Sequence, residues 1–200
     1  MNYPKSLKDL IECYKKLPGV GEKSAERMAL ATLELDQDIV TLFSTTVGNI
    51  KNSIKRCKKC NNYCEDDYCD ICKDESRNNN TICVVEEPKN VNLFERVGSY
   101  NGLYHVLGGL ISPLDGISPN EIKIDLLLER LKNEDIKEII FALKPSIEGE
   151  TTILYITKLL EGKNITISKI AHGVPMGAEI DYLDSLTLEM ALEDRKKINN

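Results

Sequence analysis

Four cysteines in the middle of the chain form two matched pairs, Cys57 with Cys60 and Cys69 with Cys72, with eight residues between the pairs. Two residues between paired cysteines allow both thiolates to reach one tetrahedral metal ion, and a second pair completes the shell. A shell closed by protein ligands stabilises structure and leaves no position for a substrate. The spacing therefore predicts one structural zinc ion, held in a short module between two longer parts of the chain. Four free thiols, or a redox role for the pairs, are the alternatives.

Three further cysteines bring the total to seven, an odd count that favours metal binding in a reducing compartment over disulfides. Cys64 breaks the two-residue spacing, so we expect it to be a free thiol. Cys13 and Cys83 fall in a predicted helix and strand, where a small buried apolar side chain is the usual role of cysteine. The basic residues around the first pair are compatible either with compensation of thiolate charge or with nucleic-acid contact; they are Lys55, Arg56, Lys58 and Lys59.

The net charge of −6 is unevenly distributed along the 200 residues. Residues 1–60 carry 11 Lys and Arg against 7 Asp and Glu, whereas residues 61–200 carry 15 against 25. A basic front on an acidic body indicates a nucleic-acid contact confined to the front, although a solvated face would give the same balance. No apolar run is long enough to span a bilayer, and the first ten residues lack the apolar core of a secretory signal. We therefore expect a cytoplasmic protein.

The first 56 residues have the pattern of three helices, the first capped by Ser6. Between the first two helices, Gly19 and Gly21 allow a tight turn and leave backbone N–H groups free at the start of the second helix, where an anion can bind. Lys23 and Arg27 are four residues apart on that helix and share a face. This pattern predicts a helix-hairpin-helix that binds the nucleic-acid backbone through these four residues; a plain helical turn is the alternative. A phosphate-binding P-loop is excluded, because Glu22 stands where that motif requires glycine.

After the cysteine module, the polar run 77–80 is typical of a linker, and short apolar runs then alternate with helical patterns. Strands are predicted at 81–85, 103–107, 139–143 and 165–170, and helices at 88–97, 121–132, 148–161 and 185–196. Strands that alternate with helices indicate a parallel sheet covered on both faces. The predicted fold class is a multi-domain α+β protein with a helix-hairpin-helix at 1–56, a four-cysteine zinc finger at 57–76 and a C-terminal α/β domain at 77–200.

Acidic residues follow two of the predicted strands. Glu86 ends the first strand, and Glu148 and Glu150 come shortly after a later one, at the sheet edge where ligand sites form. Carboxylates at neighbouring strand ends are able to hold magnesium, but Glu148 and Glu150 also suit the first turn of a helix.

The order of these parts resembles the RecR family of bacterial recombination mediators over essentially the whole chain. The resemblance rests on LPGVGEKSAERMA, the two cysteine pairs, ICVVEEP, LGGLISPLDGI, PSIEGETT and IAHGVPMGAEIDYLD. It implies that the α/β domain is Toprim-like and that the C-terminal tail contains a Walker-B-like stretch that joins subunits. Catalytic Toprim enzymes bind magnesium through an aspartate-x-aspartate, whereas Lys144 and Ser146 stand at these positions here. RecR proteins usually have asparagine at the position of Lys144.

The resemblance implies a DNA-binding mediator of recombinational repair that is not an enzyme. Such a protein acts with RecO, and often RecF, to load RecA on single-stranded DNA, and it assembles into rings, commonly tetramers. The acidic face with Glu86, Glu148 and Glu150 is then expected to bind a basic partner such as RecO. The alternatives are a small Toprim-type magnesium-dependent nuclease or primase, and a scaffold without DNA contact. The two histidines, His105 and His172, have no nucleophile partner in the sequence and are expected to be structural.

Overall fold

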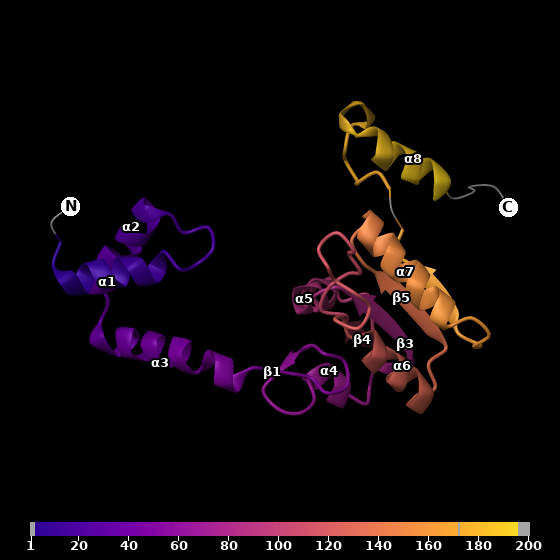
Figure 1. The fold of residues 1–200 in the computed structure, drawn as a ribbon, viewed down its shortest axis with the longest axis horizontal. Helices are drawn as coiled ribbons and strands as arrows, with labels where there is room; N and C mark the ends of the chain where they lie inside the picture. Colours follow the sequence, from indigo (N-terminus) through magenta and orange to yellow (C-terminus); the bar gives the residue numbers. More distant parts are fainter. Residues whose placement is uncertain (1–2, 172, 196–200) are drawn as a thin grey trace. The chain divides into compact units, whose positions relative to one another are not determined.

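The computed structural model describes residues 3–171 and 173–195. The chain divides into two compact units, Met1–Ser53 and Ile54–Asn200. The first unit contains three helices: α1 (Lys5–Tyr14), α2 (Glu22–Leu33) and α3 (Gln37–Ser53). The second begins with the cysteine module and continues into a four-stranded sheet with its helices (Figure 1).

The first unit is held together by the packing of α1 against α2. Its buried residues are Leu7 and Ile11 of α1 with Ala25 and Ala29 of α2, at the helical spacing that the sequence predicts. The small alanines allow the two helices to approach closely. Ser6 lies inside α1, and Pro4 occupies the N-cap position, so the predicted serine cap is wrong. Helix α3 has no buried residue within this chain.

The cysteine module consists of a short hairpin and one turn of helix: β1 (Lys55–Arg56), β2 (Tyr63–Cys64) and α4 (Asp70–Lys73). Strands β1 and β2 are antiparallel, and the hairpin presents the first cysteine pair. Such a small module buries too little apolar surface to fold alone, so its stability is expected to depend on contacts with its neighbours and on the zinc that the cysteine spacing predicts.

The sheet has the strand order β4-β3-β5-β6, and all neighbouring strands are parallel. The strands are β3 (Asn78–Val85), β4 (Gly102–Val106), β5 (Glu138–Ala142) and β6 (Thr166–Lys169). The helices are α5 (Pro88–Val97), α6 (Ile124–Asn133) and α7 (Ile147–Leu159), followed by the 3-10 helix η1 (Ile180–Tyr182) and by α8 (Ser185–Glu193). The fold class and the parallel sheet are confirmed.

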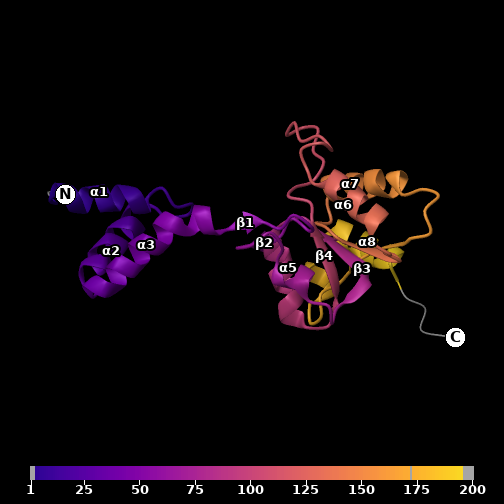
Figure 2. The same ribbon diagram turned by 90° about the horizontal axis from the view of Figure 1, so that it is seen from below.

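Both faces of the sheet are covered, as a parallel sheet requires. Alternate residues of β3 point to opposite sides: Ile82 and Val84 pack with α6 and α7, whereas Cys83 and Val85 pack with α5. Figure 2 shows the sheet edge-on, with α6 and α7 above it and α5 below it. The larger core therefore lies under α6 and α7.

Candidate DNA-binding, zinc and acidic sites

The turn between α1 and α2 is built by the residues that the sequence singles out. The Val20 amide donates to the Leu17 carbonyl at 3.2 Å, with Pro18 and Gly19 between them and Gly19 at φ +80°. Proline followed by a residue with positive φ is the signature of a type II turn, in which glycine is strongly preferred. Gly21 is the N-cap of α2, and no side chain caps that helix. A Cβ at either glycine would meet no atom within 4 Å, so the turn is open to an approaching backbone.

Two cations stand beside this turn. Lys23 and Arg27 lie one helical turn apart on α2, both are exposed, and neither forms an ion pair within the described residues. Glu22, by contrast, lies 3.6 Å from the ammonium of Lys15, which neutralises the acid nearest the turn. The arrangement leaves unpaired positive charge and the uncapped start of a helix on one open surface, a combination that attracts phosphate.

The four paired cysteines converge on one point. Their Sγ atoms all lie within 4.8 Å of one another, and Cys57, Cys60 and Cys69 are buried. Among the described residues, this is the one set of three or more potential metal ligands gathered in this way. A zinc–sulfur distance of about 2.3 Å places tetrahedral sulfurs about 3.8 Å apart. The observed separation of 3.5 Å between the Cys60 and Cys69 sulfurs fits that geometry.

The thiols of this cluster perturb one another. Hydrogen bonding with Cys60, and further with Cys69 and Cys72, lowers the pKa of Cys57, while hydrogen bonding to Cys57 raises the pKa of Cys60. Four sulfurs this close cannot all be ionised without a cation between them, since each thiolate repels the next. An all-sulfur, four-ligand set is the one that a structural zinc ion prefers.

Three of the basic residues around the first cysteine pair have local partners. Lys58 pairs with Asp67 at 2.8 Å, Lys59 with Glu134 at 3.3 Å, and Arg56 lies over the ring of Tyr63. These contacts occupy each of the three side chains within the protein itself.

The three cysteines outside the cluster differ in their burial. Cys83 is buried as expected, whereas Cys13 is exposed, so its predicted burial is wrong. The Cys64 thiol donates to the Asp66 carbonyl at 3.0 Å and lies outside the cluster.

The first cysteine pair is also joined to the sheet. The Val106 amide donates to the Cys60 carbonyl at 2.8 Å, and the Asn61 side-chain amide donates to the Val106 carbonyl at 2.8 Å. Asn61 is buried and has φ +62°, the one positive φ outside glycine in the described residues. Because β4 is an outer strand, these bonds occupy backbone groups that would otherwise face outward. We call residues 57–62, the loop that makes these bonds to β4, the knuckle.

The acidic residues lie at the carboxyl edge of the sheet. Glu86 follows β3, and it lines a cavity of about 320 Å³ together with Lys144, which follows β5. Glu148 and Glu150 lie in the first turn of α7, where a hydrogen bond from the Ser146 hydroxyl lowers the pKa of Glu148. Glu150 lies 3.4 Å from the ammonium of Lys169. The three carboxylates do not form a metal-ligand group within the described part of the chain.

His105 is fully buried in β4, and its Nε2 donates to the Lys123 carbonyl at 2.8 Å. Desolvation lowers its pKa to about 4, so the ring is neutral at pH 7. His172 lies outside the described residues. Two buried polar residues, Asn61 and Arg130 of α6, could not be identified from the sequence.

The local sequence pattern does not indicate their burial, because it depends on hydrogen bonds to β4, which is distant in the sequence.

Comparison with known families matches the three parts in order. Residues 7–49 match the family model of the RecR helix-hairpin-helix, residues 54–74 match that of the RecR four-cysteine zinc finger domain, and residues 80–171 match that of the Toprim domain. Residues 173–196 match the model of the RecR C-terminal region. The fold and these matches define a zinc-finger protein with a Toprim domain and a helix-hairpin-helix, the element that supports DNA binding.

A curated relative covers almost the whole chain. "Recombination protein RecR" of Lactobacillus helveticus (strain DPC 4571) is 45% identical over 196 residues, which are 98% of this chain and 98% of the relative. This chain belongs to the RecR family, as its resemblance predicts, and its role is that of a recombination mediator with a zinc finger. No helix within residues 3–171 and 173–195 is long and apolar enough to cross a membrane.

Proposed function

We propose that this mediator binds the DNA backbone through Gly19, Gly21, Lys23 and Arg27 and performs no reaction on the strand. The observation that carries the proposal is the pair of exposed cations, without ion-pair partners among the described residues, beside the uncapped start of α2. Backbone amides and the helix dipole would hold one phosphate, and the two side chains would reach its neighbours. None of these groups reads base edges, so the contact would be independent of sequence.

The test is the double variant Lys23→Ala, Arg27→Ala, measured by fluorescence anisotropy with single- and double-stranded DNA at several salt concentrations. Loss of two phosphate contacts should weaken binding and reduce the slope of log K against log salt by about 1.8 on duplex DNA. The matched control is Lys5→Ala with Lys8→Ala, which removes the same charge from the far part of α1. Equal behaviour of the two double variants would exclude the hairpin as the DNA site and favour a scaffold without DNA contact.

The absence of catalysis is proposed from the acidic edge of the sheet. Lys144 shares a cavity with Glu86, and an ammonium group there opposes the binding of a divalent cation. The competing function is a magnesium-dependent nuclease or primase. It predicts turnover of DNA or nucleotides that requires magnesium and is lost in Glu86→Ala, so such turnover would refute the proposal.

We propose that Cys57, Cys60, Cys69 and Cys72 are the ligands of the zinc ion, one per chain. Its role would be structural: four protein sulfurs complete the shell, so no reactant can bind to the metal. The chemistry that it supplies is charge neutralisation among the thiolates, which allows the knuckle to hold its shape against β4.

The partners are proposed from surface character. Glu86, Glu148 and Glu150 would bind a basic partner such as RecO, with RecF as a further partner in loading RecA. Affinity for purified RecO should fall in Glu148→Gln with Glu150→Gln. It should not fall in Glu34→Gln with Asp38→Asn, an equal change of charge on the N-terminal helices.

Self-association is supported by α3, whose apolar residues remain exposed in the single chain: Ile39, Leu42, Phe43, Val47 and Ile50. A contiguous apolar stripe of this length marks an interaction surface. We propose a homodimer or homotetramer able to form a ring. Replacement of Leu42 and Val47 by serine should lower the native mass measured by light scattering, and an unchanged mass would exclude α3 as the contact.

A further inference from the structure

A buried guanidinium in α6 has one nitrogen without a partner. The Arg130 side chain is 2% exposed, its Nε donates to Glu134 at 2.8 Å, and its Nη1 donates to the Tyr104 carbonyl at 2.7 Å. Its Nη2 is buried and has no hydrogen-bond partner among the described residues. A buried donor without an acceptor is costly, so an acceptor is expected at this nitrogen.

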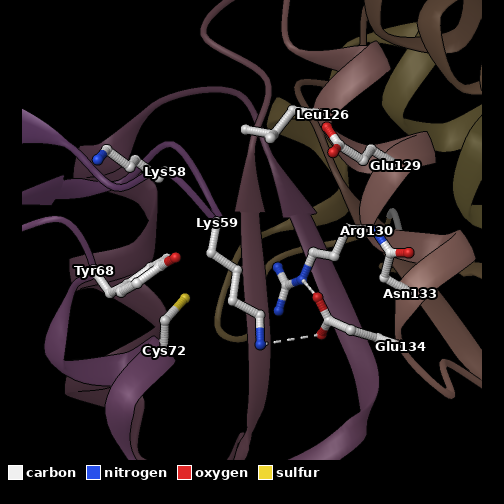
Figure 3. Close-up of a pocket in the computed structure, with 9 residues that line it drawn as sticks. All are labelled: Lys58, Lys59, Tyr68, Cys72, Leu126, Glu129, Arg130, Asn133 and Glu134. Carbon is white, nitrogen blue, oxygen red and sulfur yellow. Dashed lines mark hydrogen bonds and ion pairs between the residues drawn. The ribbon is translucent and has the colours of Figure 1, made fainter.

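A cavity lies beside this arginine. Its volume is about 440 Å³, within the range of small-molecule sites. The zinc finger forms one wall and α6 the other, and both belong to the same compact unit. Figure 3 shows the guanidinium directed toward the space between the two walls. The lining includes Lys58, Lys59 and Tyr68 of the finger and Leu126, Arg130 and Asn133 of α6.

Two cations, Arg130 and Lys59, lie beside one carboxylate in the more buried part of this cavity, which is also lined by Cys72 of the cysteine cluster. Arg130 and Lys59 share one carboxylate, that of Glu134, at 2.8 Å and 3.3 Å. Lys58 is balanced by Asp67 outside the cavity, and the other lining acid, Glu129, is exposed. Each of these two cations has a further N–H group from which a second oxyanion is able to accept, Arg130 through Nη2 and Lys59 through its ammonium. Phosphate is the group that such a combination of arginine and lysine commonly binds.

An aromatic and an apolar side chain, Tyr68 and Leu126, also line the cavity. Tyr68 is about half exposed, its hydroxyl points into the space, and Leu126 provides an apolar surface opposite (Figure 3). The Asn133 amide lies on the same wall as Leu126 and offers both a donor and an acceptor. A base stacks on a tyrosine ring without regard to its identity.

We propose that this cavity binds a nucleoside monophosphate unit, with its phosphate on Arg130 Nη2 and Lys59 and its base against Tyr68. The unit is either a free nucleotide or one nucleotide of a DNA strand. The proposal does not rest on the hairpin, because the cavity and the hairpin belong to separate compact units.

The test is isothermal titration of the zinc-loaded full chain with thymidine monophosphate, inorganic phosphate and thymidine. The expected order of affinity is monophosphate, then phosphate, then thymidine. Lys59→Met should weaken the first two by about tenfold, the effect of losing one charge-assisted contact. Tyr68→Ala should weaken the monophosphate and leave phosphate unchanged. Lys132→Met, a change of the same charge on α6 outside the cavity, should have no effect. Arg130 is left intact because it also supports the Tyr104 carbonyl.

Three results would overturn the proposal: thymidine binding as tightly as its monophosphate, Lys59→Met binding the monophosphate like the parent, or no heat of binding for any of the three probes. The source of the nucleotide is distinguished in the Lys23→Ala, Arg27→Ala background, where the hairpin is disabled. Displacement of the monophosphate by a short oligothymidylate identifies a strand as the source, and its failure to compete identifies the free nucleotide.

Discussion

Asn61 should be one of the most sensitive residues of the zinc finger, although it is not one of the proposed metal ligands. Its side-chain amide supports the Val106 carbonyl, and its backbone holds a positive φ that most residues avoid. In Asn61→Gly the backbone conformation remains available, and the loss is one buried hydrogen bond, which leaves a carbonyl unpaired at a cost of about 1–3 kcal/mol. In Asn61→Ala the same bond is lost and the backbone is also strained. The strain adds about 1 kcal/mol, net of the greater freedom of glycine in the unfolded chain.

The assay is unfolding in urea at saturating zinc. Unfolding is monitored through hydrogen exchange in the peptide that contains residues 102–107. A local probe is needed because the two compact units would contribute separate transitions to a whole-chain signal. The neighbouring Asn62→Ala is the control: its side chain accepts only from the exposed Tyr63 amide, so a change of about 0.5 kcal/mol or less is expected. The reasoning is refuted by a glycine variant as stable as the parent, or by an alanine variant no weaker than the glycine one.

Three other substitutions test separate features. Gly149→Ala should destabilise the sheet domain in urea by about 1–3 kcal/mol, because its Cβ would lie 2.0 Å from the Lys144 carbonyl oxygen. His105 has a folded pKa of about 4, below the ordinary 6.5, so its contribution is present above pH 6.5 and is lost as the pH falls toward 4. That loss is about 3 kcal/mol, and His105→Gln should flatten urea stability against pH, with excess zinc present throughout. Metal analysis should find no zinc in Cys60→Ser and one equivalent in Cys64→Ser; the reverse would exchange their assigned roles.

The elements of the sheet could be predicted because their sequences are locally consistent. Runs such as Ile82–Val85 are β-branched and apolar, and Pro88 begins α5 as predicted. The predicted linker at 77–80 is wrong, because β3 begins at Asn78. Asparagine is disfavoured in strands, but here hydrogen bonds to other segments override that preference. The Asn78 amide donates to the Asn101 carbonyl, and the Lys137 amide donates to the Asn80 carbonyl.

The candidate sites were predictable where spacing alone decides the chemistry. The four proposed cysteine ligands follow from two pairs with a two-residue gap, and their sulfurs do gather in space. Arg130 could not be found in this way, because an arginine in an amphipathic helix normally faces solvent. Its burial depends on the Tyr104 carbonyl, 26 residues away in the sequence. Likewise, periodicity identified the apolar stripe of α3 but carries no information about what covers it.

The knuckle has a consequence for the making of the protein. In a newly synthesised chain that has not yet bound zinc, the Val106 peptide group on the outer strand β4 lacks its hydrogen bonds to Cys60 and Asn61. This uncovered peptide group is then open to strand addition by another molecule, which is a route to aggregation. We therefore expect the yield of non-aggregated chain to depend on the zinc supplied during growth, independently of DNA binding.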